Sequence, residues 1–440
     1  MSRAMHPLAC ELNARIRAAS ADVYALLSER GRRLYFPKGI LSQTAEARAK
    51  AQRFDATIGV ATERRHVPMV LPSLASHLGD LEAAEAVSYA PATGQPELRA
   101  AWRQKLLAQG PALRGRTFGL PVVTCGITHG LALVGDLFVD PGDRLVLPAP
   151  LWGNYRLGYE TRLGAEIETF PLYSEDGRFN VAGLRAALGS GPEKQLVLLN
   201  FPNNPTGYTP LQSEVEAIRA ALLDAAESGR RICVILDDAY FGLTYDEGVL
   251  DESLFGELTG AHPRLLPIKL DGATKELYAW GLRTGFLTFG TPSGSGEPEA
   301  LLAALESKTA GAIRSGISNA SQLSQTLVLD ALRSPSLESE RRALFETLRA
   351  RALRVREVAG RPGYRASFDV HPFNSGYFMC VRVKGVDAEA LRVHLLDRYG
   401  VGLIALGEHD LRIAFSSLEL DEIEPLFALL ERAIADLREA

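Results

Sequence analysis

Between about residues 120 and 300, short apolar runs alternate with helical stretches, and this alternation constrains the fold of the 440-residue chain most. The apolar runs are Pro121–Thr124, Arg144–Leu147, Gln195–Asn200, Arg231–Leu236, Leu265–Lys269 and Gly285–Phe289. Helical stretches such as Ser213–Ala226 lie between several of them. Strands that alternate with helices indicate a mostly parallel sheet covered on both faces. We therefore predict an α/β fold that binds its ligands just beyond the carboxyl ends of the strands.

The last quarter of the chain has a different sequence pattern, which predicts a second, smaller α+β domain. It contains a charged helical segment (Glu338–Val358), two strand-like regions (Phe368–Val383 and Gly402–Phe415) and a closing amphipathic helix (Asp421–Ala440). We expect residues 1–75 to be an N-terminal segment that joins this small domain. Residues 76–335 then form the large domain, and residues 336–440 form the small C-terminal domain.

Composition excludes several classes of protein. The net charge of −5 and the pI near 6.0 provide no basic surface for nucleic acid. No run of about 18 apolar residues is present to span a membrane, and the N-terminus lacks the pattern of a signal peptide. The four cysteines form no CxxC pair, and the eight histidines show no metal-ligand spacing, so we expect no metal and a cytoplasmic protein.

Lys275 and Arg283 are the first candidate site residues, because both follow the apolar run that ends at Lys269. A lysine in a partly buried pocket near other cations loses its proton readily, and the free amine is then a nucleophile. Arg283, eight residues later, is able to bind a phosphate with two hydrogen bonds. Taken alone, a lysine such as Lys275 is most often a solvated surface cation, and Arg283 is equally typical of an ordinary salt bridge on a helix surface.

Polar groups also follow two other predicted strands. Asp237 directly follows the run Arg231–Leu236. A carboxylate buried at the end of a strand requires a cation or a hydrogen-bond donor nearby. Asp238 is the competing candidate, although strand alternation points it to the other face. Tyr240 lies three residues after Asp237, and Asn204 lies in an Asn-Pro-Thr-Gly loop after a strand. Alone, these sequences are typical of turns and caps.

Three further features suit anions or a flat aromatic ligand. The segment Gly126-Ile127-Thr128 follows a strand and precedes a helix, so its backbone N–H groups are able to bind a phosphate. Trp152 is able to stack on an aromatic ring. Arg412 lies within an apolar strand and requires a buried anion, either a substrate carboxylate or an internal salt bridge. Arg64 and Arg65 are a second possible anion site, with a solvated loop as the alternative.

The order and spacing of these residues closely resemble those of the fold-type I pyridoxal-phosphate enzymes, and within them the class I/II aminotransferases typified by aspartate aminotransferase. The resemblance covers roughly residues 55–415. It implies a large cofactor-binding domain with a seven-stranded type of sheet. It also implies that Lys275 bonds covalently to the cofactor, that Asp237 binds the ring nitrogen, and that Asn204 and Tyr240 contact the ring oxygen.

The same resemblance assigns the remaining positions. Arg283, Gly126, Ile127, Thr128 and Thr274 are expected to hold the cofactor phosphate, Trp152 to stack on the ring, and Tyr89 to reach the phosphate of a neighbouring subunit. Gly59, Trp152, Asn204 and Arg412 are expected to contact substrate, Arg412 through its carboxylate. One departure is visible, because family members often have serine three residues before the lysine, where this chain has Gly272.

The implied activity is transfer of an amino group between an L-amino acid and a 2-oxo acid by ping-pong transimination on Lys275, in a homodimer with shared active sites. Two alternatives exist: another pyridoxal-phosphate activity on the same scaffold (β-lyase, racemase or decarboxylase), and an aminotransferase-like effector domain of a transcription regulator. Retention of a carboxylate by Arg412 argues against decarboxylation. The roughly 60 residues before the core leave little room for a DNA-binding module. The sequence does not identify the amino donor.

Overall fold

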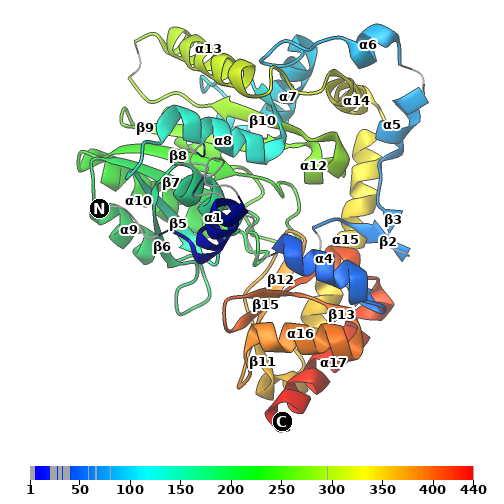
Figure 1. The fold of residues 1–440 in the computed structure, drawn as a ribbon. Coiled ribbons are helices and arrows are strands. Elements are labelled where there is room, and N and C mark those ends of the chain that lie inside the picture. The colour runs from blue at the N-terminus through cyan, green and yellow to red at the C-terminus, as the bar shows by residue number, and fades with distance from the viewer. Residues whose placement is uncertain are drawn as a thin grey trace.

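A seven-stranded sheet, called here the large sheet, organises most of the chain (Figure 1). The computed structural model describes residues 5–19, 27, 32, 40–57, 59–64, 67–79, 81–294 and 296–439. The strand order is β4-β10-β9-β8-β7-β5-β6. Its strands are β4 (Val122–Cys125), β5 (Arg144–Ala149), β6 (Glu166–Pro171), β7 (Lys194–Asn200), β8 (Arg231–Asp237), β9 (Leu265–Gly272) and β10 (Thr284–Phe289). All neighbours pair in parallel except β10, which is antiparallel to β4 and β9. The predicted mostly parallel sheet is confirmed.

Each of the six predicted apolar runs overlaps one of these strands, and only β6 was missed. β6 is the edge strand beside β5, and most of its residues are exposed or half-buried. Its sequence Glu166-Ile167-Glu168-Thr169 therefore lacks the continuous apolar character of a central strand. An edge strand that faces solvent gives little signal of this kind.

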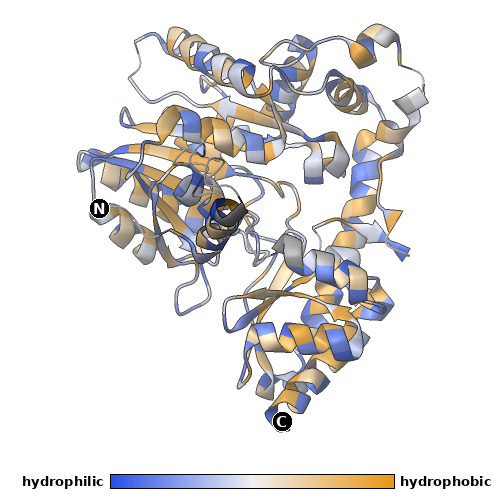
Figure 2. Ribbon diagram, viewed as in Figure 1, coloured by the Kyte–Doolittle hydropathy of each residue, from blue (hydrophilic) through white to orange (hydrophobic). Residues whose placement is uncertain are grey.

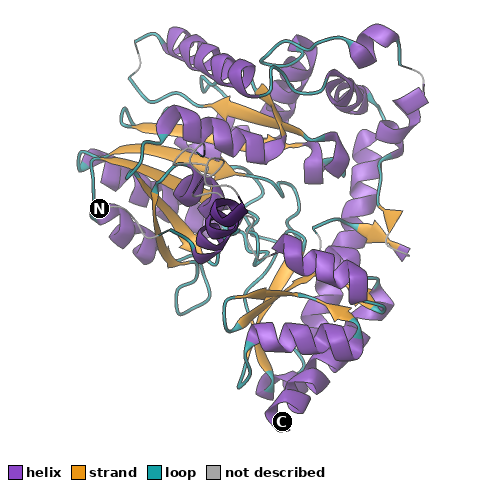
Figure 3. Cartoon of the chain, viewed as in Figure 1, coloured by secondary structure: helices purple, strands orange, loops and turns teal. Residues whose placement is uncertain are grey.

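Helices cover both faces of the large sheet. All residues of β10, and all but the first of β7, are buried. Because successive side chains of a strand point to opposite faces, both faces must be covered. Figure 2 shows the apolar strands, and Figure 3 shows the helices packed around them. These helices are α7 (Pro96–Gln109), α8 (Gly126–Phe138), α9 (Val181–Gly189), α10 (Val215–Glu227), α11 (Leu254–Leu258), α12 (Ala273–Glu276) and α14 (Gln322–Arg333). Farther from the sheet, α5 (Pro72–Ala75) and α6 (Ala83–Val87) pack on α14, and α13 (Pro298–Gly316) packs on α8.

A second, four-stranded antiparallel sheet, the small sheet, has the order β11-β12-β15-β14. Its strands are β11 (Phe368–Val370), β12 (Phe378–Val383), β14 (Ile404–Leu406) and β15 (Asp410–Ala414), and its helices are α16 (Ala388–Tyr399) and α17 (Leu420–Glu439). The long helix α15 (Leu337–Ala359) runs from the side of the large sheet to the small sheet and packs against α17 (Figure 1). The charged segment predicted as a helix at 338–358 is this connection.

Residues 40–55 of the N-terminal segment pack beside the small sheet. Helix α4 (Ile40–Lys50) contacts α16, β14 and β13 (Val401–Gly402), and β1 (Phe54–Asp55) pairs in parallel with β13. The other N-terminal elements are α1 (Pro7–Ala19), β2 (Thr62–Glu63) and β3 (Val67–Pro68). Short helical turns are η2 (Ser76–Gly79), η3 (Pro111–Leu113), η4 (Arg156–Arg162, a π-helix), η5 (Gln212–Glu214), η6 (Trp280–Leu282), η7 (Pro362–Ala366) and η8 (Phe415–Ser417). Within the ranges that the structure covers, none of the helices combines the length and apolar character needed to cross a bilayer.

Candidate active site

A cavity of about 590 Å³ lies at the carboxyl edge of the large sheet and extends to β12 and β15 of the small sheet. Because β4 runs parallel to β9, the loops after β4, β5, β7, β8 and β9 all meet at this edge. Eleven of the thirteen predicted site residues line the cavity, the exceptions being Gly126 and Tyr89. The eleven are Gly59, Ile127, Thr128, Trp152, Asn204, Asp237, Tyr240, Thr274, Lys275, Arg283 and Arg412.

Lys275 lies on the short helix α12, directly after β9. Its ammonium nitrogen lies 5.0 Å from the centre of the Tyr240 ring. Burial lowers the pKa of Lys275 to about 8, with Arg283 acting in the same direction and the Asp237 carboxylate opposing it. A pKa near 8 leaves part of the amine uncharged at neutral pH, so Lys275 is able to act as a nucleophile.

Asp237 is the last residue of β8 and only 2% exposed. Its carboxylate accepts hydrogen bonds from the Tyr155 hydroxyl (2.7 Å) and the Ala239 backbone N–H (3.1 Å). Burial raises the pKa of Asp237 to about 6, while the hydrogen bond from Tyr155 and the charge of Lys275 lower it. Most of this carboxylate is therefore ionised at neutral pH, and it is suited to a cationic N–H donor.

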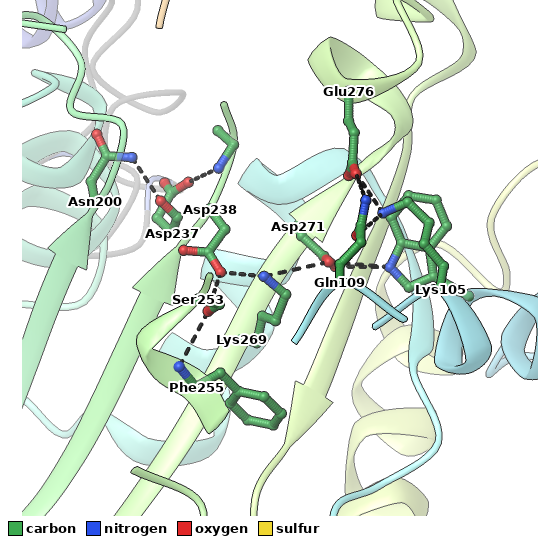
Figure 4. Close-up of polar contacts among 12 residues, drawn as sticks. Lys105, Gln109, Asn200, Asp237, Asp238, Ser253, Phe255, Lys269, Asp271 and Glu276 are labelled. Atoms are coloured by element: carbon green, nitrogen blue, oxygen red, sulfur yellow. Dashed lines mark hydrogen bonds and ion pairs between the residues drawn. The ribbon is translucent and has the colours of Figure 1, made fainter. Parts of the chain in front are cut away.

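Asp238 points to the opposite side of β8, as strand alternation predicts. It forms a buried ion pair with Lys269 on β9 and accepts a hydrogen bond of 2.6 Å from the Ser253 hydroxyl (Figure 4). The two neighbouring carboxylates are thus separated: Asp237 lines the cavity and Asp238 lies in a polar cluster behind the sheet edge.

The N-terminus of α8 and Arg283 form a positively polarised end of the cavity. Gly126 begins α8 with a φ of 74°, which is left-handed and favours glycine. A Cβ at this position would lie 2.4 Å from Nη2 of Arg283. The guanidinium therefore rests against the first turn of the helix, close to N–H groups that are free to bind an anion. Thr128 and Thr274 place hydroxyl groups on the wall of the same cavity.

The departure at Gly272 has a steric explanation. A Cβ at residue 272 would lie 2.8 Å from the Cα of Gly285 and 2.8 Å from the carbonyl oxygen of Thr284. Both contacts are to the backbone of the paired strand β10, which cannot move aside as a side chain does. Serine does not fit here without a backbone shift, and the hydroxyl of Thr274 is the one available beside the lysine.

Arg412, in the middle of β15, is buried without a carboxylate partner in the described ranges. Its Nη1 donates to the Asn204 side-chain oxygen (3.1 Å), and its Nη2 donates to the carbonyl oxygen of Thr57 (2.7 Å). Its buried Nε has no partner in the part of the chain that the structure describes. Burial lowers the pKa of Arg412 to about 10. The guanidinium also lies over the Phe378 ring, 4.2 Å from its centre. Such an arginine fits an anionic ligand better than the internal salt bridge considered from the sequence.

Several lining residues were not predicted. They are Thr44, Arg48, Tyr155, Asn200, Ala239, Trp280 and Phe378. Asn200, at the end of β7, donates to the Asp237 carbonyl oxygen (2.8 Å) and accepts from the Asn204 N–H (2.8 Å). It therefore connects two of the predicted site residues through their backbones.

Tyr89 and Arg64 lie away from the cavity. The Tyr89 side chain is 90% exposed. Arg64 forms a surface ion pair with Asp421 (3.0 Å) and is not part of the cavity wall, and Arg65 lies outside the described residues. The second anion site considered from the sequence is therefore not formed by Arg64.

The donor set fits the four parts of pyridoxal phosphate. Arg283 and the α8 N-terminus suit the phosphate, and Asp237 suits a protonated ring nitrogen. Lys275 suits the aldehyde carbon, and Trp152 at the cavity wall suits the ring face. The orphaned Nε of Arg412 leaves a further donor for a carboxylate.

Residues 61–430 match the model of the aminotransferase class I and II family. Two similar relatives are a probable aspartate/prephenate aminotransferase of Aquifex aeolicus and an arginine–pyruvate transaminase of Pseudomonas aeruginosa. The first is 27% identical over 66% of this chain and 69% of the relative, and the second is 29% identical over 64% of this chain and 65% of the relative. Other curated relatives are matched over less than half of their length.

Solved structures agree with the fold over nearly the whole chain. An aminotransferase from Anaerococcus prevotii superposes with a TM-score of 0.82 at 21% identity, covering 93% of this chain and 99% of the other. The cytoplasmic aspartate aminotransferase of Saccharomyces cerevisiae superposes with a TM-score of 0.77 at 21% identity, covering 95% and 100%. Identities this low show the shared architecture alone.

Proposed function

Because the chain belongs to the class I and II aminotransferase family, it is a pyridoxal-phosphate-dependent aminotransferase of fold type I, and we propose that its reaction takes place in the cavity around Lys275. The substrates are an amino acid and a 2-oxo acid. The observation that carries this proposal is the joint placement of the Lys275 amine, the Asp237 carboxylate and the Arg283 guanidinium on one cavity wall.

When bound, pyridoxal phosphate supplies an electron sink that stabilises negative charge at the substrate α-carbon. Residues of the chain bind and orient the reactants and transfer the proton. Asp237 keeps the ring nitrogen protonated, and Tyr155 holds the Asp237 carboxylate in place through the 2.7 Å hydrogen bond. Arg412 and Asn204 orient the substrate carboxylate. The Lys275 amine removes the α-proton and returns it, acting as general base and then as general acid.

The test is a screen of amino acids against the cofactor-loaded protein. We expect the absorption spectrum to change as the amino group is taken up, and to return when a 2-oxo acid is added. Lys275→Ala abolishes turnover, whereas Lys308→Ala, at an exposed position on α13, retains it. Product analysis with and without a 2-oxo acid separates transfer from elimination, racemisation and decarboxylation. Wild-type transfer rates in Lys275→Ala refute the assignment.

We also propose a homodimer in which Tyr89 contacts the cofactor phosphate of the neighbouring subunit. The support is the exposure of two adjacent large side chains, Val87 (81%) and Tyr89 (90%), on a segment that does not reach its own cavity. A cytoplasmic location is supported by four free cysteines, which suit a reducing compartment. We propose the same domain limits as the sequence indicates, at residues 75/76 and 335/336. Light scattering of the purified protein tests the dimer.

A further inference from the structure

Helix α4 is fixed on the small sheet by one of its faces. The Gln43 side chain accepts a hydrogen bond from the backbone N–H of Ala405 (3.0 Å). Glu46 pairs with Arg392 (2.9 Å), and Lys50 pairs with Asp397 (2.7 Å). Ala47 packs closely on β13, because a Cβ added to Gly402 of that strand would lie only 2.7 Å from the Cβ of Ala47. Residues 43, 46, 47 and 50 follow the spacing of one helix face, so the register of α4 is determined.

This register turns Thr44 and Arg48 toward the active-site cavity, where both form part of the wall. The two residues are four positions apart and therefore lie one above the other on the same side of α4. Arg48 is an exposed residue, and no ion pair or hydrogen bond of its guanidinium is found among the parts of the chain that the structure describes.

The cavity has more cationic than anionic groups. Arg48, Lys275, Arg283 and Arg412 line it, against the single carboxylate of Asp237. In the proposed function Lys275 binds the cofactor covalently, Arg283 binds its phosphate and Arg412 binds the substrate α-carboxylate. Arg48 is then the one lining cation, within the described ranges, that has no assigned anion.

Thr44 provides a second, independent observation. The residue is only 6% exposed, and its buried hydroxyl oxygen has no hydrogen-bond partner among the described residues. Buried hydroxyl groups in proteins are nearly always paired. Thr44 and Arg48 thus place two hydrogen-bond donors one helical turn apart on the wall of the cavity. Neither donor has an acceptor among the described residues.

We propose that Thr44 and Arg48 bind the substrate side chain and that this side chain carries a second carboxylate. The inference rests on the proposed function and adds its substrate class: dicarboxylic amino acids and the corresponding 2-oxo acids. The α-carboxylate is bound by Arg412 from β15, and the distal carboxylate by Arg48 and Thr44 from α4. A planar guanidinium is able to bind a carboxylate with two parallel hydrogen bonds.

The first experiment measures binding without turnover. The cofactor-loaded protein is titrated with glutarate, a dicarboxylate, and with pentanoate, which has the same chain length and one carboxylate. We expect glutarate to bind at least ~10-fold more tightly, as charge-assisted hydrogen bonds contribute. Arg48→Met removes that preference. Lys50→Met, on the same helix but paired with Asp397 away from the cavity, keeps it.

The second experiment compares glutamate with norvaline in the amino-donor half-reaction. Arg48→Met lowers kcat/KM for glutamate by about 10- to 100-fold and changes it for norvaline by less than about 3-fold. Equal use of both amino acids by the wild type, or equal losses in the variant, overturns the inference while the proposed function stands. If no amino acid reacts, the proposed function fails, and the glutarate titration still decides whether Arg48 binds a second carboxylate.

Discussion

Replacing Lys269 by Met tests the buried polar cluster behind the active site. The Lys269 ammonium pairs with Asp238 and lies 3.6 Å from the Asp271 carboxylate. Both carboxylates and the ammonium are buried, and Figure 4 shows Lys269 between Asp238 and Asp271. Trp102 donates its ring N–H to Asp271 (3.1 Å). Met has a similar length, so the substitution removes the charge with little change in packing.

The expected loss follows from the two carboxylates that remain. Removing one partner of a buried ion pair leaves an uncompensated charge and costs about 3–5 kcal/mol. By comparison, an exposed pair such as Lys50–Asp397 contributes about 0–1 kcal/mol. We therefore expect Lys269→Met to lower the free energy of unfolding by about 3–5 kcal/mol. The charge of Asp238 already raises the pKa of Asp237, so loss of its counterion raises it further and weakens cofactor binding.

Urea unfolding of the wild type, Lys269→Met and Lys50→Met measures this difference, and cofactor titration measures the effect on Asp237. Adding Asp238→Asn to Lys269→Met removes one of the unpaired charges, so the double variant recovers part of the lost stability. A loss below about 1 kcal/mol for Lys269→Met, or a double variant less stable than the single one, contradicts the reasoning.

Three further predictions concern the residues that are expected to bind the cofactor. Because the pKa of Lys275 is lowered to about 8, the rate of cofactor uptake rises about tenfold between pH 7 and pH 9 and then levels off in stopped-flow measurements. The pKa of Lys275 in the folded protein is lower than the usual lysine value of 10.5, so between about pH 8 and 10.5 unfolding binds a proton. The cofactor-free protein therefore gains stability as the pH rises through this window. Gly126→Ala forces a Cβ against Arg283 and raises the cofactor dissociation constant at least ~10-fold in a fluorescence titration; unchanged affinity contradicts that role of the helix start.

The strand ends were predictable from the sequence because buried strands give continuous apolar runs and polar residues mark where they stop. Asp237 and Lys275 were placed in this way, and both line the cavity. Tyr155 was not predicted, because its contact with Asp237 joins residues 82 positions apart. Asn200 was read only as the end of a strand, although its side chain bonds the backbone 37 positions away.

Charged residues outside the strand pattern could not be located from the sequence. Arg64 and Arg48 are both arginines of the N-terminal segment, and the sequence singled out Arg64, beside Arg65, rather than Arg48 as a possible anion site. The structure separates them, because Arg64 pairs with Asp421 on the surface whereas α4 places Arg48 at the cavity. The difference depends on how α4 packs on β13 and β14, a contact between residues far apart in the chain.

The most direct test of the central claim is to identify which residue bonds to the cofactor. The purified, cofactor-loaded protein is reduced with borohydride, digested and analysed by mass spectrometry. We predict a single pyridoxyl-phosphate adduct on the peptide that contains Lys275, and none in Lys275→Ala. An adduct on another lysine, or a wild-type protein that remains unlabelled after incubation with pyridoxal phosphate, contradicts the account.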